Sequence, residues 1–221
     1  MDEEIKKSIL KTGTSIVGIV CKDGIIMAGD RKAVAGTIVL SKNAPKVFQI
    51  NDYLLLAGTG TASDVQMLIK VIAAELRLKH LRSKQRPTVR EAANLIAMVS
   101  FRNIRQFSTI PSIAGSLVGG VNEDGIFELY TIEPAGSIQK VEDYDANFSS
   151  GMPFILGLLE RNYKKDIMVR EAISLAVDCL KSSTQRDIGS GFGIDVFSIT
   201  KEGIKKEVEQ EITSTYTERA K

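Results

Sequence analysis

The order of β-type and helix-type apolar patterns along the chain constrains its fold more than any other feature. The β-type runs form three blocks, at 14–20, 25–30, 37–41, 46–50 and 53–58, then at 112–121, 126–132 and 137–144, and finally at 193–199. A pair of stretches with helical spacing separates the first block from the second, and another pair separates the second from the third. This order predicts one domain, a layered α+β sandwich of two packed sheets with helices outside.

Local signals support this assignment. The Lys22-Asp23-Gly24 turn between the first two runs predicts a β-hairpin, and Thr88 with Glu91 predicts a capping box at the start of the second helix. The predicted buried faces of the four helices are Val65, Leu68, Ile69, Ile72 and Leu76; Ala92, Leu95, Ile96 and Val99; Phe154, Leu158 and Leu159; and Val169, Ala172, Ile173, Ala176 and Leu180. The chain from about Lys205 onward is interpreted as a charged tail.

Composition and charge narrow the class of protein. A chain of 221 residues that is 43% hydrophobic and 25% charged is globular. The formal net charge of +2, the scattered basic residues and the lack of Trp argue against a nucleic-acid binder. No apolar run is long enough for a membrane span, and the acidic N-terminus lacks the apolar core of a secretory signal. Cys21 and Cys179 lie in apolar stretches, so we expect buried free thiols and a cytoplasmic, reducing location.

The chain has a single histidine, and this limits its possible catalytic mechanisms. His80 lies in the charged sequence RLKHLRSK at the end of the first long helix, where a solvated position is expected. A Ser-His or Cys-His hydrolase would need this imidazole beside its nucleophile, and the sequence has no GxSxG elbow. Clustered zinc ligands and phosphate-binding glycine motifs are also missing. We therefore expect neither a metal nor a cofactor.

Threonine can act as a nucleophile without histidine. Its own α-amine serves as the base when threonine is the first residue of a mature chain. The reference pKa of an α-amine is roughly 7.7–8.0, so it can accept a proton near neutrality. Gly13-Thr14 has the required form, because glycine gives the backbone the freedom that self-cleavage needs. A leader would then have to be removed immediately before Thr14.

Four sequence blocks, in this order, resemble the β subunits of the archaeal-type 20S proteasome. They read GTSIVGIVCKDGIIMAGDRKA, SKNAPKVFQI, SSGMPFILGLLE and QRDIGSGFGIDV. The resemblance runs from about Gly13 to about Ile199, nearly the whole chain after the leader. It implies the N-terminal-nucleophile (Ntn) hydrolase fold, a four-layer αββα sandwich of two antiparallel sheets flanked by helices. It also implies a propeptide at 1–13, removed by autolysis, and a single mature domain at 14–221.

The resemblance assigns roles to individual residues. It implies Thr14 as the catalytic threonine, freed after Gly13, and Asp30 as the partner of Lys46. Gly60 would supply the backbone N–H of the oxyanion hole. The remaining catalytic positions are Ser150, Asp187 and Ser190. The walls of the substrate pocket are Ala33, Ala44, Gly58 and Ala62, all small and uncharged, so we expect cleavage after large hydrophobic residues.

Each catalytic position also has an ordinary structural interpretation. Asp30 and Arg31 could be a surface pair at a strand end, Lys46 a half-exposed strand end, Ser150 a helix N-cap, and Asp187 a helix-end cap. The functional interpretation is favoured because all the positions match together. The sequence departs from the usual family pattern at Ser15, Ile16, Thr59, Ser63 and Met152. None of these departures removes a catalytic group.

The resemblance implies a threonine endopeptidase that degrades unfolded proteins. The implied partners are other β subunits and α-subunit rings, in heptameric rings that form a four-ring barrel, with a regulatory AAA+ ATPase acting indirectly. Nucleic acid and membrane are not expected partners. Two alternatives stay open, namely a non-catalytic structural subunit of the β ring and another Ntn amidohydrolase that acts on a small molecule.

Overall fold

Two five-stranded antiparallel sheets form the centre of the computed structural model, which describes residues 13–109, 111–213 and 215. The first sheet has the order β10-β1-β2-β11-β12, formed by Tyr144–Asp145, Ile16–Cys21, Gly24–Asp30, Gly193–Thr200 and Gly203–Glu211. The second has the order β5-β6-β7-β8-β9, formed by Val47–Asn51, Leu54–Gly60, Ala114–Val121, Phe127–Ile132 and Ile138–Val141. A small ribbon of β3 (Ala33–Ala35) and β4 (Ile38–Ser41) extends from the end of β2.

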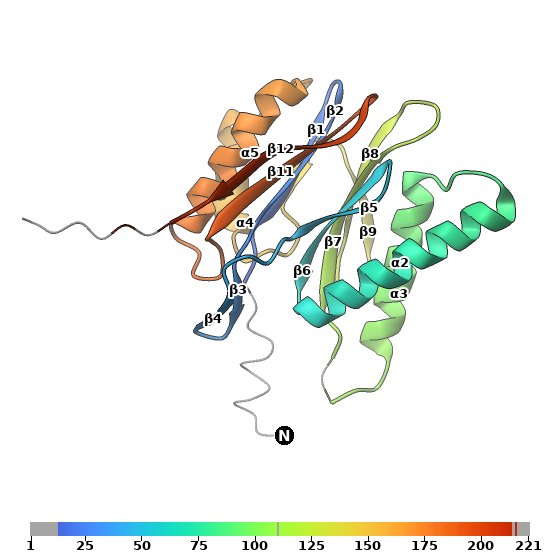
Figure 1. The fold of residues 1–221 in the computed structure, drawn as a ribbon, viewed down its shortest axis with the longest axis horizontal. Helices are drawn as coiled ribbons and strands as arrows, with labels where there is room; N and C mark the ends of the chain where they lie inside the picture. The colour runs from blue at the N-terminus through green and yellow to red at the C-terminus, as the bar shows by residue number, and fades with distance from the viewer. Residues whose placement is uncertain (1–12, 110, 214, 216–221) are drawn as a thin grey trace, which may run out of the picture.

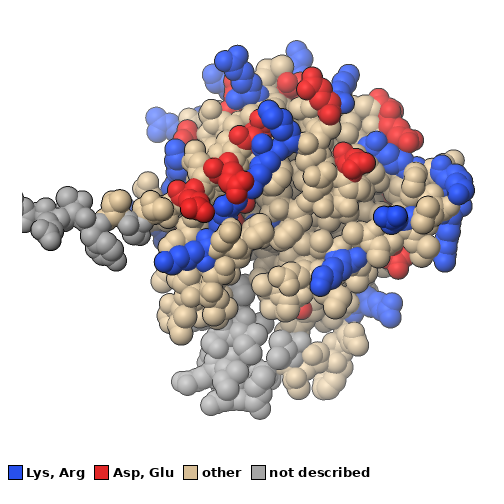
Figure 2. All heavy atoms as spheres, in the orientation of Figure 1, with Lys and Arg blue, Asp and Glu red and all other residues tan. Residues whose placement is uncertain are grey.

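Four helices cover the outer faces of the sheets (Figure 1). Helices α4 (Met152–Asn162) and α5 (Val169–Thr184) pack on the first sheet, and α2 (Ala62–Ser83) and α3 (Val89–Arg105) pack on the second. The predicted αββα sandwich is confirmed. Charges of both signs are interspersed over the face shown in Figure 2, as expected for a chain of small net charge.

Strands β1, β2 and β6 are apolar on both faces because both faces are buried. Ile16 of β1 packs between the two sheets with Leu117 of β7 and Leu129 of β8. Its neighbours Val17 and Ile19 belong to the cluster formed with the helices on the first sheet. Successive side chains of a strand point to opposite faces, so each central strand needs apolar residues at almost every position. This explains why β1, β2 and β6 lack a polar-apolar alternation, whereas the apolar residues of β4 are exposed.

Several local predictions are confirmed. The hairpin of β1 and β2 forms around the predicted turn, and Thr88 and Glu91 make both hydrogen bonds of a capping box. Both cysteines are buried free thiols, and burial raises the pKa of each thiol to about 12. His80 is exposed, with Nδ1 3.1 Å from the carbonyl oxygen of Gln85. Among the described residues, no helix has the length and apolar character that crossing a membrane requires.

Several assignments from the sequence were wrong. The β-type run at 137–144 is not one strand but two, β9 and β10, which belong to different sheets. The chain from Gly203 to Glu211 is strand β12 and pairs with β11 over its whole length, although its sequence suggests only a charged tail. An edge strand is held by backbone hydrogen bonds to its one neighbour, so it does not need an apolar pattern. Phe154 was predicted to lie on the buried face of α4, but it is 36% exposed. Ile155 is buried in its place.

Candidate active site

Thr14 lies two residues before the start of β1, with Ser15 between them. Thr14 is only 4% exposed. The Thr14 hydroxyl donates a hydrogen bond to the carbonyl oxygen of Gly13 at 2.6 Å, and its N–H donates to Oγ of Ser150 at 3.0 Å. The hydroxyl is therefore held beside the carbonyl group of the Gly13–Thr14 peptide bond.

Glycines at this point allow two backbone segments to meet. A Cβ atom on Gly13 would lie 2.1 Å from Cα of Gly189, a separation that real structures exclude. Gly189 belongs to the loop between α5 and β11, so this contact places the Gly13–Thr14 bond against that loop. A residue with a side chain at position 13 would push the Gly13–Thr14 peptide bond away from this loop.

Asp30 is the last residue of β2 and is fully buried. Its carboxylate accepts hydrogen bonds from the N–H groups of Ser15, Lys32 and Gly191, each at 2.9 Å. Burial raises the pKa of Asp30 to about 6, while the charge of Lys46 and the three N–H groups oppose this rise. The three bonds fix the start of β1 to the loop that precedes β11.

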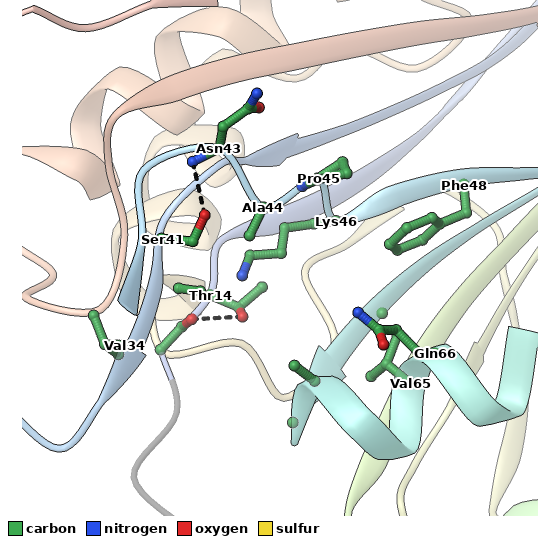
Figure 3. A pocket seen from close by; sticks show the side chains of 15 residues that line it. Thr14, Val34, Ser41, Asn43, Ala44, Pro45, Lys46, Phe48, Val65 and Gln66 are labelled. Carbon is green, nitrogen blue, oxygen red and sulfur yellow. Dashed lines mark hydrogen bonds between the residues drawn. The ribbon is translucent and has the colours of Figure 1, made fainter. Parts of the chain in front are cut away.

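Lys46 precedes β5 and is half-buried. Burial lowers the pKa of its ammonium group, and the nearby charge of Asp30 partly offsets this effect. Figure 3 shows the Lys46 amine pointing toward Thr14. In the described part of the chain no direct ion pair joins Lys46 to Asp30. The two charges interact by longer-range Coulomb attraction, which opposes the effect of burial on both pKa values.

Asp187 accepts hydrogen bonds from two hydroxyl groups, and a third hydroxyl joins the network through one of them. Ser150 donates to Oδ2 of Asp187 at 2.6 Å, and Ser190 donates to the same oxygen. The hydroxyl oxygen of Ser15 lies 2.7 Å from that of Ser190. The resulting chain of hydrogen bonds runs from the Thr14 N–H through Ser150 and Asp187 to Ser190 and Ser15. The sequence did not single out Ser15 for a role in this network.

Gly60 ends β6 on the opposite sheet and lines the same cavity as Thr14. Its φ of +103° is a backbone conformation that residues with a side chain rarely adopt. A Cβ atom would also lie 2.2 Å from the carbonyl oxygen of Ile113. Both observations require glycine here, next to the predicted nucleophile.

A cavity of about 410 Å³ opens beside Thr14 (Figure 3). All four predicted wall residues line it, namely Ala33, Ala44, Gly58 and Ala62. Val34, Phe48, Val65 and Gln66 also line it, although no sequence motif marks them as wall residues. The volume falls within the usual range for small-ligand sites, roughly 300–1,000 Å³.

Arg31 is buried beside the site, so the interpretation of Asp30 and Arg31 as a surface pair is wrong. The guanidinium of Arg31 makes two hydrogen bonds to Asp195 of β11, at 2.9 and 2.7 Å, and also contacts Glu209 of β12. Lys206 adds an ion pair to Asp195 at 2.9 Å. Among the described residues, no group of three or more His, Cys, Asp or Glu side chains has the arrangement of a metal site.

The four-layer αββα sandwich is the fold of the Ntn-hydrolase class of proteins. A family model described as "Proteasome subunit" matches residues 10–199. The chain belongs to this family, as an archaeal-type proteasome β subunit.

Its similarity to individual relatives covers most of both chains. It is 42% identical to the proteasome subunit beta of Nanoarchaeum equitans over 193 residues, which is 87% of this chain and 96% of the relative. It is 38% identical to proteasome subunit beta 1 of Thermococcus kodakarensis, over 91% of this chain and 96% of the relative. For the proteasome subunit beta of Methanopyrus kandleri the identity is 37%, over 91% and 94%.

Proposed function

We propose that this chain is the threonine endopeptidase subunit of a proteasome core, with Thr14 as its N-terminal nucleophile. Residues 1–13 are the propeptide, of which residues 1–12 lie outside the described part of the chain, and residues 14–221 form the mature domain. The observation that carries this proposal is the Thr14 hydroxyl, held 2.6 Å from the carbonyl oxygen of Gly13.

The proposed self-cleavage transfers an acyl group within the chain. Thr14 Oγ1 bonds to the carbonyl carbon of Gly13, the C–N bond to Thr14 breaks, and the hydroxyl proton passes to the leaving nitrogen. Ser150 is placed to relay this proton, since its hydroxyl lies 3.0 Å from the Thr14 nitrogen. Water then hydrolyses the ester, leaving a carboxylate on Gly13 and a free amine on Thr14.

The same groups serve the mature enzyme. The Thr14 amine accepts the hydroxyl proton, and Thr14 Oγ1 attacks the substrate carbonyl to form an acyl-enzyme ester. The positive charge of Lys46 lowers the pKa of the amine and of the hydroxyl, while Asp30 holds the loop behind them. The Gly60 N–H stabilises the oxyanion, a contribution on the order of 3 kcal/mol in comparable sites.

The first test is the N-terminus of the assembled protein. Intact mass and N-terminal sequencing should show a wild-type chain that starts at Thr14. Thr14→Ala should keep residues 1–13, because alanine has no hydroxyl to attack Gly13. Lys46→Ala should retain nearly all of the leader for an electrostatic reason, since the charge that activates the hydroxyl is gone.

Thr184→Val is a matched control, since the Thr184 hydroxyl donates to the carbonyl oxygen of Lys181 within α5 on an exposed surface. Its leader should be removed as in the wild type. A wild-type particle that keeps Met1–Gly13 would contradict the proposal and favour the non-catalytic structural subunit.

The proposed assembly follows from membership of the family. We expect heptameric β rings stacked between α-subunit rings in a four-ring barrel, with a AAA+ ATPase supplying unfolded protein and a cytoplasmic location. Co-expression with an archaeal α subunit, followed by native mass spectrometry, should give one particle with equal numbers of the two chains. A β chain that stays monomeric beside assembled α rings would contradict this expectation.

A further inference from the structure

We propose that Asn147 is a positioning residue for the reaction, which clamps the segment carrying Ser150 to the strand that ends in Gly60. The inference rests on the proposed function. Ser150 belongs to the segment that follows β10 of the first sheet, whereas Gly60 ends β6 of the second sheet. A fixed separation of the nucleophile from the oxyanion donor therefore requires a link between the sheets at this end of the sandwich.

The backbone of Asn147 is held in an uncommon conformation. Its φ is +47°, in the left-handed region, and the residue is only 3% exposed. Asparagine tolerates this region better than most residues. Its N–H donates to Oδ1 of Asp145 at 3.1 Å, which fixes the turn immediately after β10. Ser150 follows three residues later, so the turn sets the position of the serine hydroxyl.

The side chain of Asn147 reaches across to the second sheet. Its Nδ2 donates toward the carbonyl oxygens of Ser116 and Ile132, at 3.2 and 3.1 Å, and toward Oγ1 of Thr131 at 2.8 Å. Two of these partners are carbonyl groups, which only accept hydrogen bonds. The amide nitrogen must therefore face β7 and β8, and this orientation leaves Oδ1 facing β6.

Thr59 completes the clamp from β6. Its hydroxyl donates to Oδ1 of Asn147 at 3.3 Å, and Thr59 directly precedes Gly60. Gly115 leaves the necessary space, since a Cβ atom there would lie 2.3 Å from Oδ1 of Asn147 and 2.9 Å from Oγ1 of Thr59. One side chain thus joins the turn before Ser150 to three neighbouring strands, including the residue next to the oxyanion donor.

The physical reason for such a clamp is the precision that catalysis demands. A displacement of about 1 Å between reacting groups costs on the order of a hundredfold in rate. Thr14 and Ser150 lie in segments attached to the first sheet, and Gly60 lies in the second. A buried, paired amide between them resists their separation, because pulling it apart would leave several polar groups unpaired and away from water.

The test uses Thr59, because a change at Asn147 itself would remove every bond of the clamp and endanger folding. Thr59→Val keeps the shape but loses the hydroxyl, whereas Thr59→Ser keeps the hydroxyl. The matched control is Ser198→Ala, which removes another buried strand hydroxyl with one side-chain partner, Glu207, away from the site. Each variant is assembled with α subunits and compared with the wild type for kcat, KM and Tm on one fluorogenic peptide.

We expect Thr59→Val to lower kcat about tenfold while KM stays within about twofold, because the loss affects positioning in the transition state. Thr59→Ser should restore kcat to within about twofold of the wild type, and Ser198→Ala should leave it unchanged. The clamp would be overturned if Thr59→Val kept the wild-type kcat or changed only KM. It would also be overturned if Thr59→Ser did not restore kcat. A wild-type particle without peptidase activity would instead overturn the proposed function, and the clamp's role in the reaction with it.

Discussion

At the scale of single residues, the candidate site combines buried polar groups such as Asp30 and Ser190 with the exposed Ser150 and the half-buried Lys46, so burial affects its members unequally. Asp30 shows the consequence. Three N–H groups surround its carboxylate, yet burial still raises its pKa to about 6. The folded chain therefore binds a proton at Asp30 more readily than the unfolded chain does, and this difference makes stability depend on pH.

The first prediction at this scale concerns that dependence. The pKa of Asp30 rises from 3.8 to about 6 on folding. Between those pH values the folded chain holds a proton that the unfolded chain has released, so stability falls as pH rises through this window. The full effect is on the order of 3 kcal/mol. The stability contributed by protonated Asp30 is present at low pH and lost near neutrality.

The measurement compares Thr14→Ala with the double variant Thr14→Ala/Asp30→Asn, so that both chains keep the leader. Asparagine does not titrate, and both variants keep every other carboxylate. The difference between their Tm values therefore reports on Asp30 alone. From pH 4 to pH 7 the Tm of the chain with Asp30 should fall relative to that of the asparagine variant. A difference in Tm that stays constant over this range, or rises, would show that the pKa of Asp30 is not raised.

At the scale of elements, β12 contributes to the site although it carries none of the proposed catalytic residues. Its Glu209 contacts Arg31, and Arg31 is held by Asp195 of β11. Arg31 directly follows Asp30, and its N–H donates to the carbonyl oxygen of Gly191 at 3.2 Å. The edge strand and its neighbour thus support the loop that contacts the Asp30 carboxylate.

The prediction at this scale is a large loss of stability when the buried ion pair is broken. Arg31→Met leaves Asp195 buried with only part of its partners, which costs on the order of 3–5 kcal/mol for such pairs. The control is Lys205→Met, which removes an exposed ion pair to Glu207 on the same strand. Thermal unfolding should show a clear drop in Tm for Arg31→Met and none for Lys205→Met. Equal Tm values for the two variants would contradict the supporting role of this ion pair.

At the scale of the whole molecule, the pocket beside Thr14 is assembled from distant parts of the chain. Ala33 lies in β3, Ala44 precedes β5, Gly58 lies in β6, and Ala62 begins α2. Gly58 also permits the packing of α2 on β6, because a Cβ atom there would lie 2.4 Å from Cγ1 of Val65. Small residues from the β3–β4 ribbon, the segment before β5, strand β6 and helix α2 therefore leave the space that the substrate side chain would fill.

The corresponding prediction is a preference for large apolar residues before the cleaved bond. The cavity of about 410 Å³ has small, uncharged side chains at Ala33, Ala44 and Ala62, and Val65 and Phe48 add apolar surface. A panel of fluorogenic peptides should show the highest kcat/KM after Leu, Tyr or Phe. The highest values after acidic or basic residues would contradict this interpretation of the pocket.

The sequence by itself determined the layers and the position of the proposed nucleophile. Hydrophobic periodicity is local, so the order of strands and helices could be predicted, as could the hairpin and the capping box at Thr88. A single histidine argues against a histidine-dependent nucleophile and therefore favours Thr14 after Gly13. The family resemblance implied the other catalytic positions. β12 was missed because an edge strand of charged residues has no periodic apolar signal.

The tertiary structure alone decided which polar groups meet. Arg31 and Asp195 are 164 positions apart, and Thr59 and Asn147 are 88 apart, with no local pattern that links the members of either pair. Their bonds exist because sheet pairing and the packing of the two sheets bring distant backbone segments together in buried parts of the molecule. An unpaired polar group in such a place would raise the free energy of the folded state. Each of these groups is therefore paired, with a partner that is near only in the folded chain.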